Sequence, residues 1–211
     1  MRILALDTCL SACSAAVVED GRVRASLSEA MARGHQERLA PLVAEVVAAS
    51  GMTFADLDRI AVTVGPGSFT GLRVGLAFAK GLGAALGVPV VGIGSLEALA
   101  EPQSGVVLAA LDARRDQVYL QGFADGRAVT APDVLPVEIA AARVAELSPD
   151  RLVGSGAPFL AAVAPQARVE PSDRIDPVAV ARLAGRRDPA PPRPLYLRAP
   201  DARLPGGILP A

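Results

Sequence analysis

The stretch RIAVTVGPGSFTGLRVGLAFAKGLG (Arg59–Gly83) joins an apolar strand, a glycine-rich turn and a largely apolar helix. This order predicts an α/β domain whose turn presents backbone amides at a helix N-terminus, where an anion or a partner's carboxylate could bind. A tight turn capped by Ser68 or Thr70 is the alternative. The turn is not a Walker loop, because no Gly-Lys-Ser/Thr sequence follows its glycines. The candidate anion contacts are Gly65, Gly67, Ser68, Thr70 and Gly71.

The residues around the same turn disfavour a dinucleotide site. Thr70 stands where the third glycine of G-x-G-x-x-G is expected, and the next apolar run, VPVVGIG (Val88–Gly94), ends in glycine rather than an acid. Before the turn, RILALD (Arg2–Asp7) is predicted to be a buried strand, and two β-rich runs meet at Asp20 and Gly21, which indicates a hairpin. The order strand, hairpin, helix, strand, helix, strand predicts a layered α/β domain.

The pattern restarts halfway along the chain. VVLAALD (Val106–Asp112) echoes ILALD (Ile3–Asp7), and Asp112 lies 105 positions after Asp7 in a chain of 211 residues. We therefore expect a duplicated β-β-β-α-β-α unit, with one lobe over residues 1–100. A smaller second lobe is expected over residues 101–211, including a proline-rich linker and tail. The acids Asp7 and Asp112 are expected to face each other across a cleft, unless they only satisfy the backbone of their own turns.

Composition limits the classes of function. The chain has 21 Lys+Arg and 22 Asp+Glu residues, and a formal net charge of −1 provides no basic field that could hold tRNA alone. One histidine and two cysteines supply neither a zinc set nor a disulfide framework, which suits a reducing cytoplasm. No signal-peptide core and no membrane-spanning segment is recognisable, so we expect a cytoplasmic protein without membrane contacts.

Two helices are expected to have contrasting faces. In the helix after residue 34, His35 shares an apolar face with several aliphatic residues, which favours a packed histidine over a catalyst. A nucleophilic pair of His35 with Cys9 or Cys13 stays open. In the helix after the glycine turn, the apolar side is expected to rest on the sheet. Its opposite side is covered by a partner or, alternatively, by the first helix; this side carries Arg73, Ala77, Lys80, Gly81 and Ala84.

Several segments, in this order, resemble the TsaB family. They are MRILALDTCLSACSAAVVEDG, GHQERLAPLV, TVGPGSFTGLRVGLAFAKGL, PVVGIGSLEALA, LAALDARRDQVY and PLYLR. The resemblance is strongest through residue 100 and fades between residues 125 and 190. It implies an actin-like sugar-kinase/Hsp70 fold, of the ribonuclease-H-like kind, with duplicated β-β-β-α-β-α lobes and a reduced second lobe. This fold agrees with the internal repeat.

The resemblance also implies a function. The chain would be a non-catalytic subunit that supports a TsaD-like catalytic protein, with a TsaE-like ATPase, in threonylcarbamoyladenosine modification of tRNA. The catalytic relative has a His-x-x-x-His metal motif where this chain has Ser95 and Leu99, and neither side chain can replace imidazole. No metal or cofactor is therefore expected in the isolated chain. ATP or ADP and tRNA are expected only in the complex, and a homodimer is expected in isolation.

Docking through the two helices is a further implication of the resemblance. The implied interface residues are His35, Leu39, Leu42, Val46, Arg73, Ala77, Lys80, Gly81 and Ala84. Two alternatives stay open. One is an ATP-dependent small-molecule kinase of the same fold, which would use Asp7 and the GSG turn at residues 154–156. The other is a peptidase that acts on the partner, although no catalytic triad or metal site is recognisable.

Overall fold

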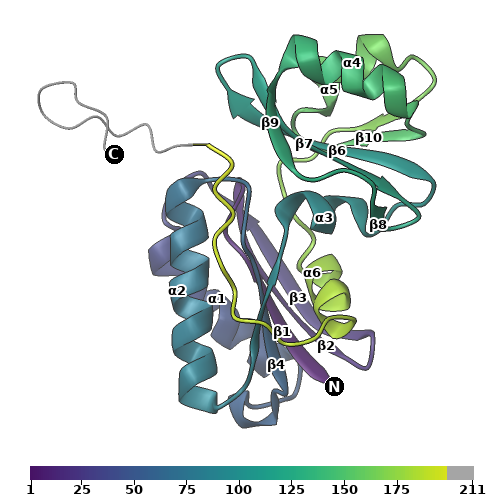
Figure 1. Ribbon diagram of the computed structural model, residues 1–211. Helices are drawn as coiled ribbons and strands as arrows, with labels where there is room; N and C mark the ends of the chain where they lie inside the picture. The colour runs from purple at the N-terminus through teal and green to yellow at the C-terminus, as the bar shows by residue number, and fades with distance from the viewer. Residues whose placement is uncertain (199–211) are drawn as a thin grey trace, which may run out of the picture.

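A computed structural model describes residues 1–198 and shows two β-sheets, one in each of two lobes (Figure 1). In the first sheet the strands are ordered β3-β2-β1-β4-β5. The strands β1, β2 and β3 pair antiparallel, whereas β4 and β5 run parallel to β1. Their bounds are β1 (Arg2–Asp7), β2 (Ala12–Glu19), β3 (Arg22–Ala30), β4 (Arg59–Thr63) and β5 (Val90–Ile93).

Helices cover both faces of this first sheet (Figure 1). One face holds α1 (His35–Ala49) and α2 (Phe69–Leu86), and the other holds α6 (Pro177–Gly185); a 3-10 turn, η1 (Phe54–Asp56), precedes β4. Successive side chains of a strand point to opposite faces. Leu4 and Leu6 of β1 therefore join the apolar cluster with α1 and α2, whereas Ile3 and Ala5 join the cluster with α6.

The second lobe repeats the strand order of the first sheet, with two long strands, β6 and β7, and several short ones. Its sheet has the order β11-β10-β6-β7-β8, with β9 also paired to β7. The strands are β6 (Val106–Arg114), β7 (Gln117–Ala124), β8 (Arg127–Ala128), β9 (Asp133–Pro136), β10 (Arg151–Val153) and β11 (Arg168–Glu170). The helices are α4 (Val137–Leu147) and α5 (Ala157–Leu160), followed by the 3-10 turn η2 (Ala161–Val163). No helix within residues 1–198 combines the length and apolarity needed to cross a membrane.

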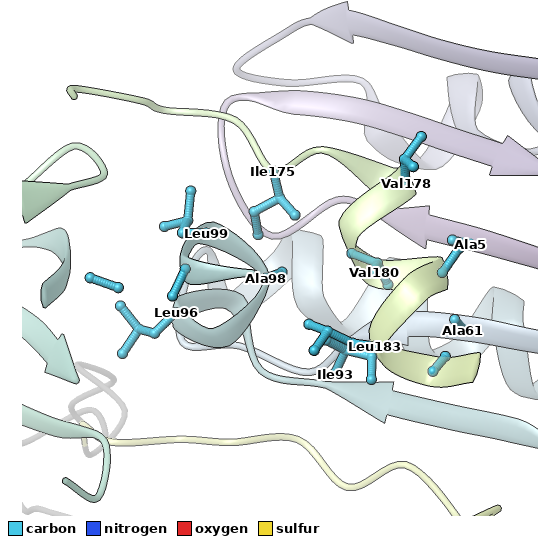
Figure 2. Close-up of a cluster of buried hydrophobic side chains, with 14 of the residues drawn as sticks. Ala5, Ala61, Ile93, Leu96, Ala98, Leu99, Ile175, Val178, Val180 and Leu183 are labelled. Carbon is cyan, nitrogen blue, oxygen red and sulfur yellow. The ribbon is translucent and has the colours of Figure 1, made fainter. Parts of the chain in front are cut away.

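The short helix α3 (Ser95–Ala100) lies between the lobes and packs against both (Figure 2). Its Leu96 and Leu99 belong to a buried cluster that contains Ile3 from the first sheet and Leu111 from the second. Because buried apolar surface is the dominant favourable term in folding, this shared cluster joins the two lobes through their cores.

The end of the described chain returns to the first lobe. The helix α6 lies in the range that the sequence assigned to the second lobe, yet it packs on β1 and β2. Residues 194–198, which we call the C-terminal strap, then run beside α2 towards the second lobe (Figure 1). The Leu195 amide donates to the Val64 carbonyl at 2.8 Å, and Arg198 Nη1 donates to the Ala113 carbonyl at 2.7 Å. The strap therefore contacts both lobes.

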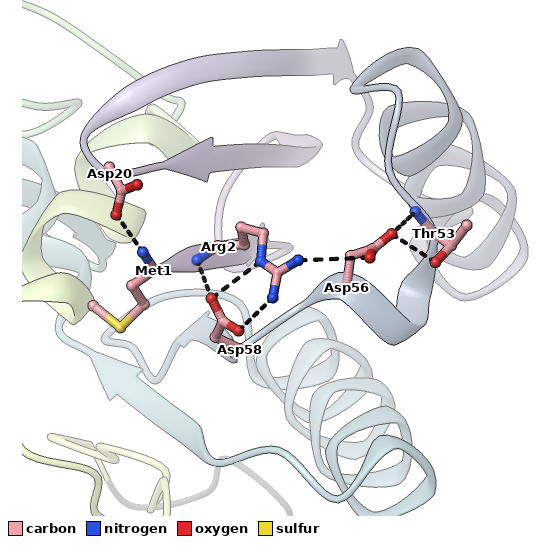
Figure 3. A network of polar contacts seen from close by, with 6 residues as sticks. All are labelled: Met1, Arg2, Asp20, Thr53, Asp56 and Asp58. Atoms are coloured by element: carbon pink, nitrogen blue, oxygen red, sulfur yellow. Dashed lines mark hydrogen bonds and ion pairs between the residues drawn. The ribbon is translucent and has the colours of Figure 1, made fainter.

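A polar network holds the N-terminal end of β1 (Figure 3). Arg2 Nη2 lies 2.9 Å from Asp58 Oδ1, and Arg2 Nη1 lies 3.5 Å from Asp56 Oδ1. The Thr53 amide donates to Asp56, and the amino group of Met1 pairs with Asp20 in the hairpin. Hydrogen bonds from Arg2 lower the pKa of Asp58 to about 2. These contacts tie β1 to the residues that precede β4 and to the β2–β3 hairpin.

Candidate docking face and interlobe cleft

The glycine turn packs directly on the turn that follows β1. The Ser68 amide donates to the Cys9 carbonyl at 2.7 Å, and Thr8 Oγ1 donates to the Gly71 carbonyl at 2.7 Å. A Cβ on Gly67 would lie 2.4 Å from the Cys9 carbonyl oxygen, and one on Gly71 would lie 2.0 Å from that of Thr8. The turn therefore needs these glycines for a close backbone contact.

Ser68 is the N-cap of α2, as the alternative interpretation of the turn had it. Its Oγ accepts the Gly71 amide at 3.2 Å, while its own amide is taken by Cys9. Gly65 is buried, and its carbonyl accepts the Ser95 amide at 2.8 Å. The expectation of a row of amides open to an anion is therefore wrong for Ser68 and Gly71. The Ser68 and Thr70 side chains remain exposed.

The two strand-end acids have different environments. Asp7 is fully buried, and its Oδ1 accepts Thr63 Oγ1 at 2.7 Å and the Cys9 amide at 3.0 Å. Burial raises the pKa of Asp7 to about 6, although these hydrogen bonds oppose the shift. Asp112 is partly exposed and accepts the Arg114 amide at 2.7 Å. The expectation that the two acids face each other across a cleft is wrong, because only Asp112 lines it.

A polar cleft of about 600 Å³ does lie between the lobes. The first lobe contributes the Cys9–Ser11 turn, Gly67 and Ser68, and the second contributes Asp112, Arg114, Tyr119 and Ser155. His35 also lines this cleft rather than the outer surface of α1, which corrects its placement in the docking interface. Its Nε2 has no hydrogen-bond partner within residues 1–198.

Neither Cys9 nor Cys13 is suited to act as a nucleophile paired with His35, the arrangement that the sequence left open. Both are fully buried. The Cys9 thiol donates to the Thr63 carbonyl, with sulfur and oxygen 3.7 Å apart, and burial raises its pKa to about 12. Burial likewise raises the pKa of Cys13 to about 11. A thiol that stays protonated at neutral pH is a poor nucleophile.

The apolar face of α1 is internal core. Leu39, Leu42 and Val46 are at most 2% exposed and pack in the cluster that contains Leu4 and Leu6 of β1. The implied docking role of Leu42 and Val46 is therefore wrong as a surface contact, since their own sheet covers them, whereas the buried Leu39 also lines the groove beside α2. The exposed side of α1 instead presents small and polar residues: Gln36, Glu37, Ala40, Pro41, Ala44, Glu45, Ala48 and Ala49.

The helix α2 has one buried and one exposed side. Leu72, Leu76 and Ala79 are buried against the sheet. The opposite side is exposed and consists of small and basic residues: Arg73, Ala77, Lys80, Gly81 and Ala84. We call these five residues the α2 outer face. Their contact with a partner stays a prediction.

A groove of about 540 Å³ lies next to this face. It is lined by Gln36, Leu39, Phe69, Thr70, Arg73, Val74, Ala77 and Phe78. At one side, the rings of Phe69 and Tyr196 have centroids 5.4 Å apart, and the guanidinium carbon of Arg73 lies 3.7 Å from the centroid of Phe69. Arg73 Nε donates to Tyr196 Oη at 3.1 Å.

Sequence reasoning missed Phe69 and Tyr196 as members of a surface site. Only 3% of the residues are aromatic, yet these two are among the exposed large apolar side chains, at 42% and 44% exposure. Nothing in the sequence signalled their exposure, although exposed aromatic residues tend to mark interaction sites.

The positions of the metal motif of the catalytic relative are buried. Ser95 is fully buried and Leu99 is 8% exposed, packed in the interlobe cluster. In the part of the chain that the structure describes, no group of three or more His, Cys, Asp or Glu residues could hold a metal ion.

The two lobes and the cleft between them define the class of protein. The structure of a ROK hexokinase from Thermus thermophilus aligns with a TM-score of 0.52 at 15% identity, covering 88% of this chain and 100% of that one. At this identity the likeness shows the fold alone. The chain thus has the actin-like, sugar-kinase-type fold that the family resemblance implied.

Closer comparisons identify the family. The family model described as TsaD, tRNA N6-adenosine threonylcarbamoyltransferase, matches residues 27–152. The tRNA threonylcarbamoyladenosine biosynthesis protein TsaB of Escherichia coli is 41% identical over 124 residues, which are 56% of this chain and 53% of that protein. A Pseudomonas aeruginosa structure, described as an uncharacterized protein with similarity to peptidase YeaZ, is 31% identical with a TM-score of 0.81, covering 93% of this chain and 99% of that one. The chain therefore belongs to the TsaB family, within the wider TsaD family.

Proposed function

We propose that this chain is a cytoplasmic, non-catalytic subunit in the synthesis of threonylcarbamoyladenosine on tRNA, and that it docks a TsaD-type catalytic protein. The names of the matching family and of the Escherichia coli relative support this pathway. The docking site is the α2 outer face. The observation that carries this assignment is that an 18-residue, largely apolar helix leaves a row of small residues exposed. Small side chains allow another helix to approach closely.

The residues that could act as catalysts are poorly placed for catalysis. Ser95 and Leu99 offer no imidazole where the catalytic relative binds metal. Asp7 is buried, and the Cys9 thiol has a pKa of about 12. These features support a subunit that assists its partner rather than one that transfers the threonylcarbamoyl group.

The remaining parts of the proposal concern the assembly. A TsaE-type ATPase is a second partner, tRNA binds through the complex, and ATP or ADP binds in the complex rather than to the isolated chain. Alone, the chain forms a homodimer. The kinase alternative requires ATP turnover by the isolated chain, and the peptidase alternative requires cleavage of the partner. The burial of Asp7 argues against the kinase, whose phosphate site would need that acid.

The substitution Ala77→Glu tests the docking site. A carboxylate buried without a partner in a helix seam should weaken binding of the TsaD-type protein about 100-fold or more, as measured by titration calorimetry. The melting temperature of the isolated chain should stay close to wild type, because exposed substitutions typically change stability by less than about 0.5 kcal/mol.

The matched control is Ala142→Glu, which places the same charge on an exposed position of α4 in the second lobe. It should bind like wild type. A folded Ala77→Glu variant with unchanged affinity would remove α2 from the interface.

A further inference from the structure

The groove beside α2 has an unusual end, formed by Phe69, Arg73 and Tyr196, which we call the aromatic–arginine cluster. We propose that this cluster is a recognition subsite completed by the C-terminal strap, and that it takes a carboxylate carried by an apolar helix of the partner. The inference rests on the proposed function, because it assigns the chemistry of the same docking partner.

The strap holds Tyr196 in place without a partner. On one side of the tyrosine, the Leu195 amide donates to Val64, and on the other, Arg198 donates to Ala113. The tyrosine hydroxyl in turn accepts a hydrogen bond from Arg73 Nε. Because these contacts form within the chain, the arginine is oriented before binding, which lowers the entropic cost of association.

The electrostatics of the cluster suit a carboxylate. The guanidinium of Arg73 lies over the Phe69 ring and uses Nε for Tyr196, and its outer N–H groups have no hydrogen-bond partner within residues 1–198. The described lining of the groove contains no acidic residue, and α2 carries Arg73 and Lys80 but no acid. A guanidinium fork binds a carboxylate through two parallel hydrogen bonds.

The walls of the groove suit an apolar helix. Phe69, Val74 and Phe78 provide aromatic and aliphatic surface, and Ala77 leaves room for a close approach. A second copy of this chain fits less well, because its α2 would bring another Arg73 and Lys80 to the same seam. On α1, Glu45 is already bound by Arg38, with Nη1 and Oε1 2.8 Å apart, whereas Glu37 is exposed. The two cations of α2 favour a different protein that carries an acidic residue, and the experiment below includes Glu37 of a second copy as the competing occupant.

The experiment measures binding of the purified TsaD-type protein from the same organism by titration calorimetry at low and high salt. Arg73→Gln should weaken binding about 10-fold or more at low salt and should reduce the salt dependence, because a charge-assisted hydrogen bond is lost. Tyr196→Phe keeps the ring and removes the hydroxyl, and it should weaken binding about 3-fold. In the Arg73→Gln background, Tyr196→Phe should have no further effect, because the hydroxyl acts by positioning the arginine.

Controls separate this inference from the proposed function. Arg127→Gln removes an exposed arginine from β8 in the second lobe and should leave the affinity and its salt dependence unchanged. If wild type fails to bind the TsaD-type protein, the proposed function itself fails. If wild type binds and Ala77→Glu abolishes binding, while Arg73→Gln binds like wild type with the same salt dependence, only the recognition subsite is overturned. Loss of self-association by Arg73→Gln without loss of partner binding would also overturn it, since the occupant would then be a second copy that presents Glu37.

Discussion

At the scale of single residues, Asp7 has a structural role in this chain. Its carboxylate lies at the end of β1, where it is buried and bonded to Thr63 and to the Cys9 amide. Its Oδ2 has no hydrogen-bond partner in the described residues. Burial disfavours the ionised form of this acid, and this cost exceeds the opposing effect of its hydrogen bonds, which explains the raised pKa.

This environment predicts a pH effect on stability. The pKa of Asp7 is about 6 in the folded chain, against 3.8 ordinarily, so the folded state binds the proton more tightly between those values. Its contribution is therefore full below pH 3.8 and is lost as the pH rises through 6, and the loss is about 3 kcal/mol. The substitution Asp7→Asn removes the titrating carboxyl group and with it this pH-dependent contribution to stability. In urea unfolding, its stability relative to wild type should rise by most of that amount, about 2 kcal/mol, from pH 4 to pH 7; a difference that does not change with pH would contradict the shift.

At the scale of secondary-structure elements, some glycines of α2 are packed against the chain's own backbone and others are exposed. Gly71 faces the turn after β1, whereas a Cβ on Gly81 would meet nothing within 4 Å. Both positions are helical and neither has a positive φ. The same substitution should therefore have opposite effects at the two positions.

The pair Gly71→Ala and Gly81→Ala tests this assignment in the isolated chain. At position 71 the new methyl group would lie 2.0 Å from a backbone oxygen, so the turn must move, and we expect a loss of about 3 kcal/mol or more. At position 81 alanine should stabilise the helix by about 0.5–1 kcal/mol. Thermal or urea unfolding gives both values. Equal changes in stability at the two positions would show that α2 does not pack on the turn after β1 through Gly71.

At the scale of the whole molecule, the net charge of the chain does not favour binding to tRNA. Its formal net charge is −1, and the basic residues of the α2 outer face are assigned to a protein partner. We therefore expect the isolated chain to bind tRNA no more tightly than about 1 µM at physiological salt. Electrophoretic mobility shift or fluorescence anisotropy would measure this. A tight, strongly salt-dependent complex of the isolated chain with tRNA would contradict this expectation, because it would require a basic surface that binds tRNA directly.

Much of the fold follows from local patterns. The apolar strands, the hairpin at Asp20 and Gly21 and the two faces of α2 all depend on neighbours that lie within a few residues along the chain. Periods of two and of 3.6 residues are visible in sequence because they arise from backbone geometry alone. The Ser68 cap is local for the same reason, since it joins residues three positions apart.

Only the tertiary structure decided what covers each apolar face. The apolar face of α1 has to be covered, but the helical spacing of its residues does not tell whether a sheet or a partner covers it. In the structure Leu42 faces the chain's own sheet. The burial of Asp7 and the return of α6 to β1 depend likewise on contacts between distant segments. The bond between Arg73 and Tyr196 joins residues 123 positions apart. Such pairs leave no periodic trace in the sequence, because the packing of the whole chain brings them together.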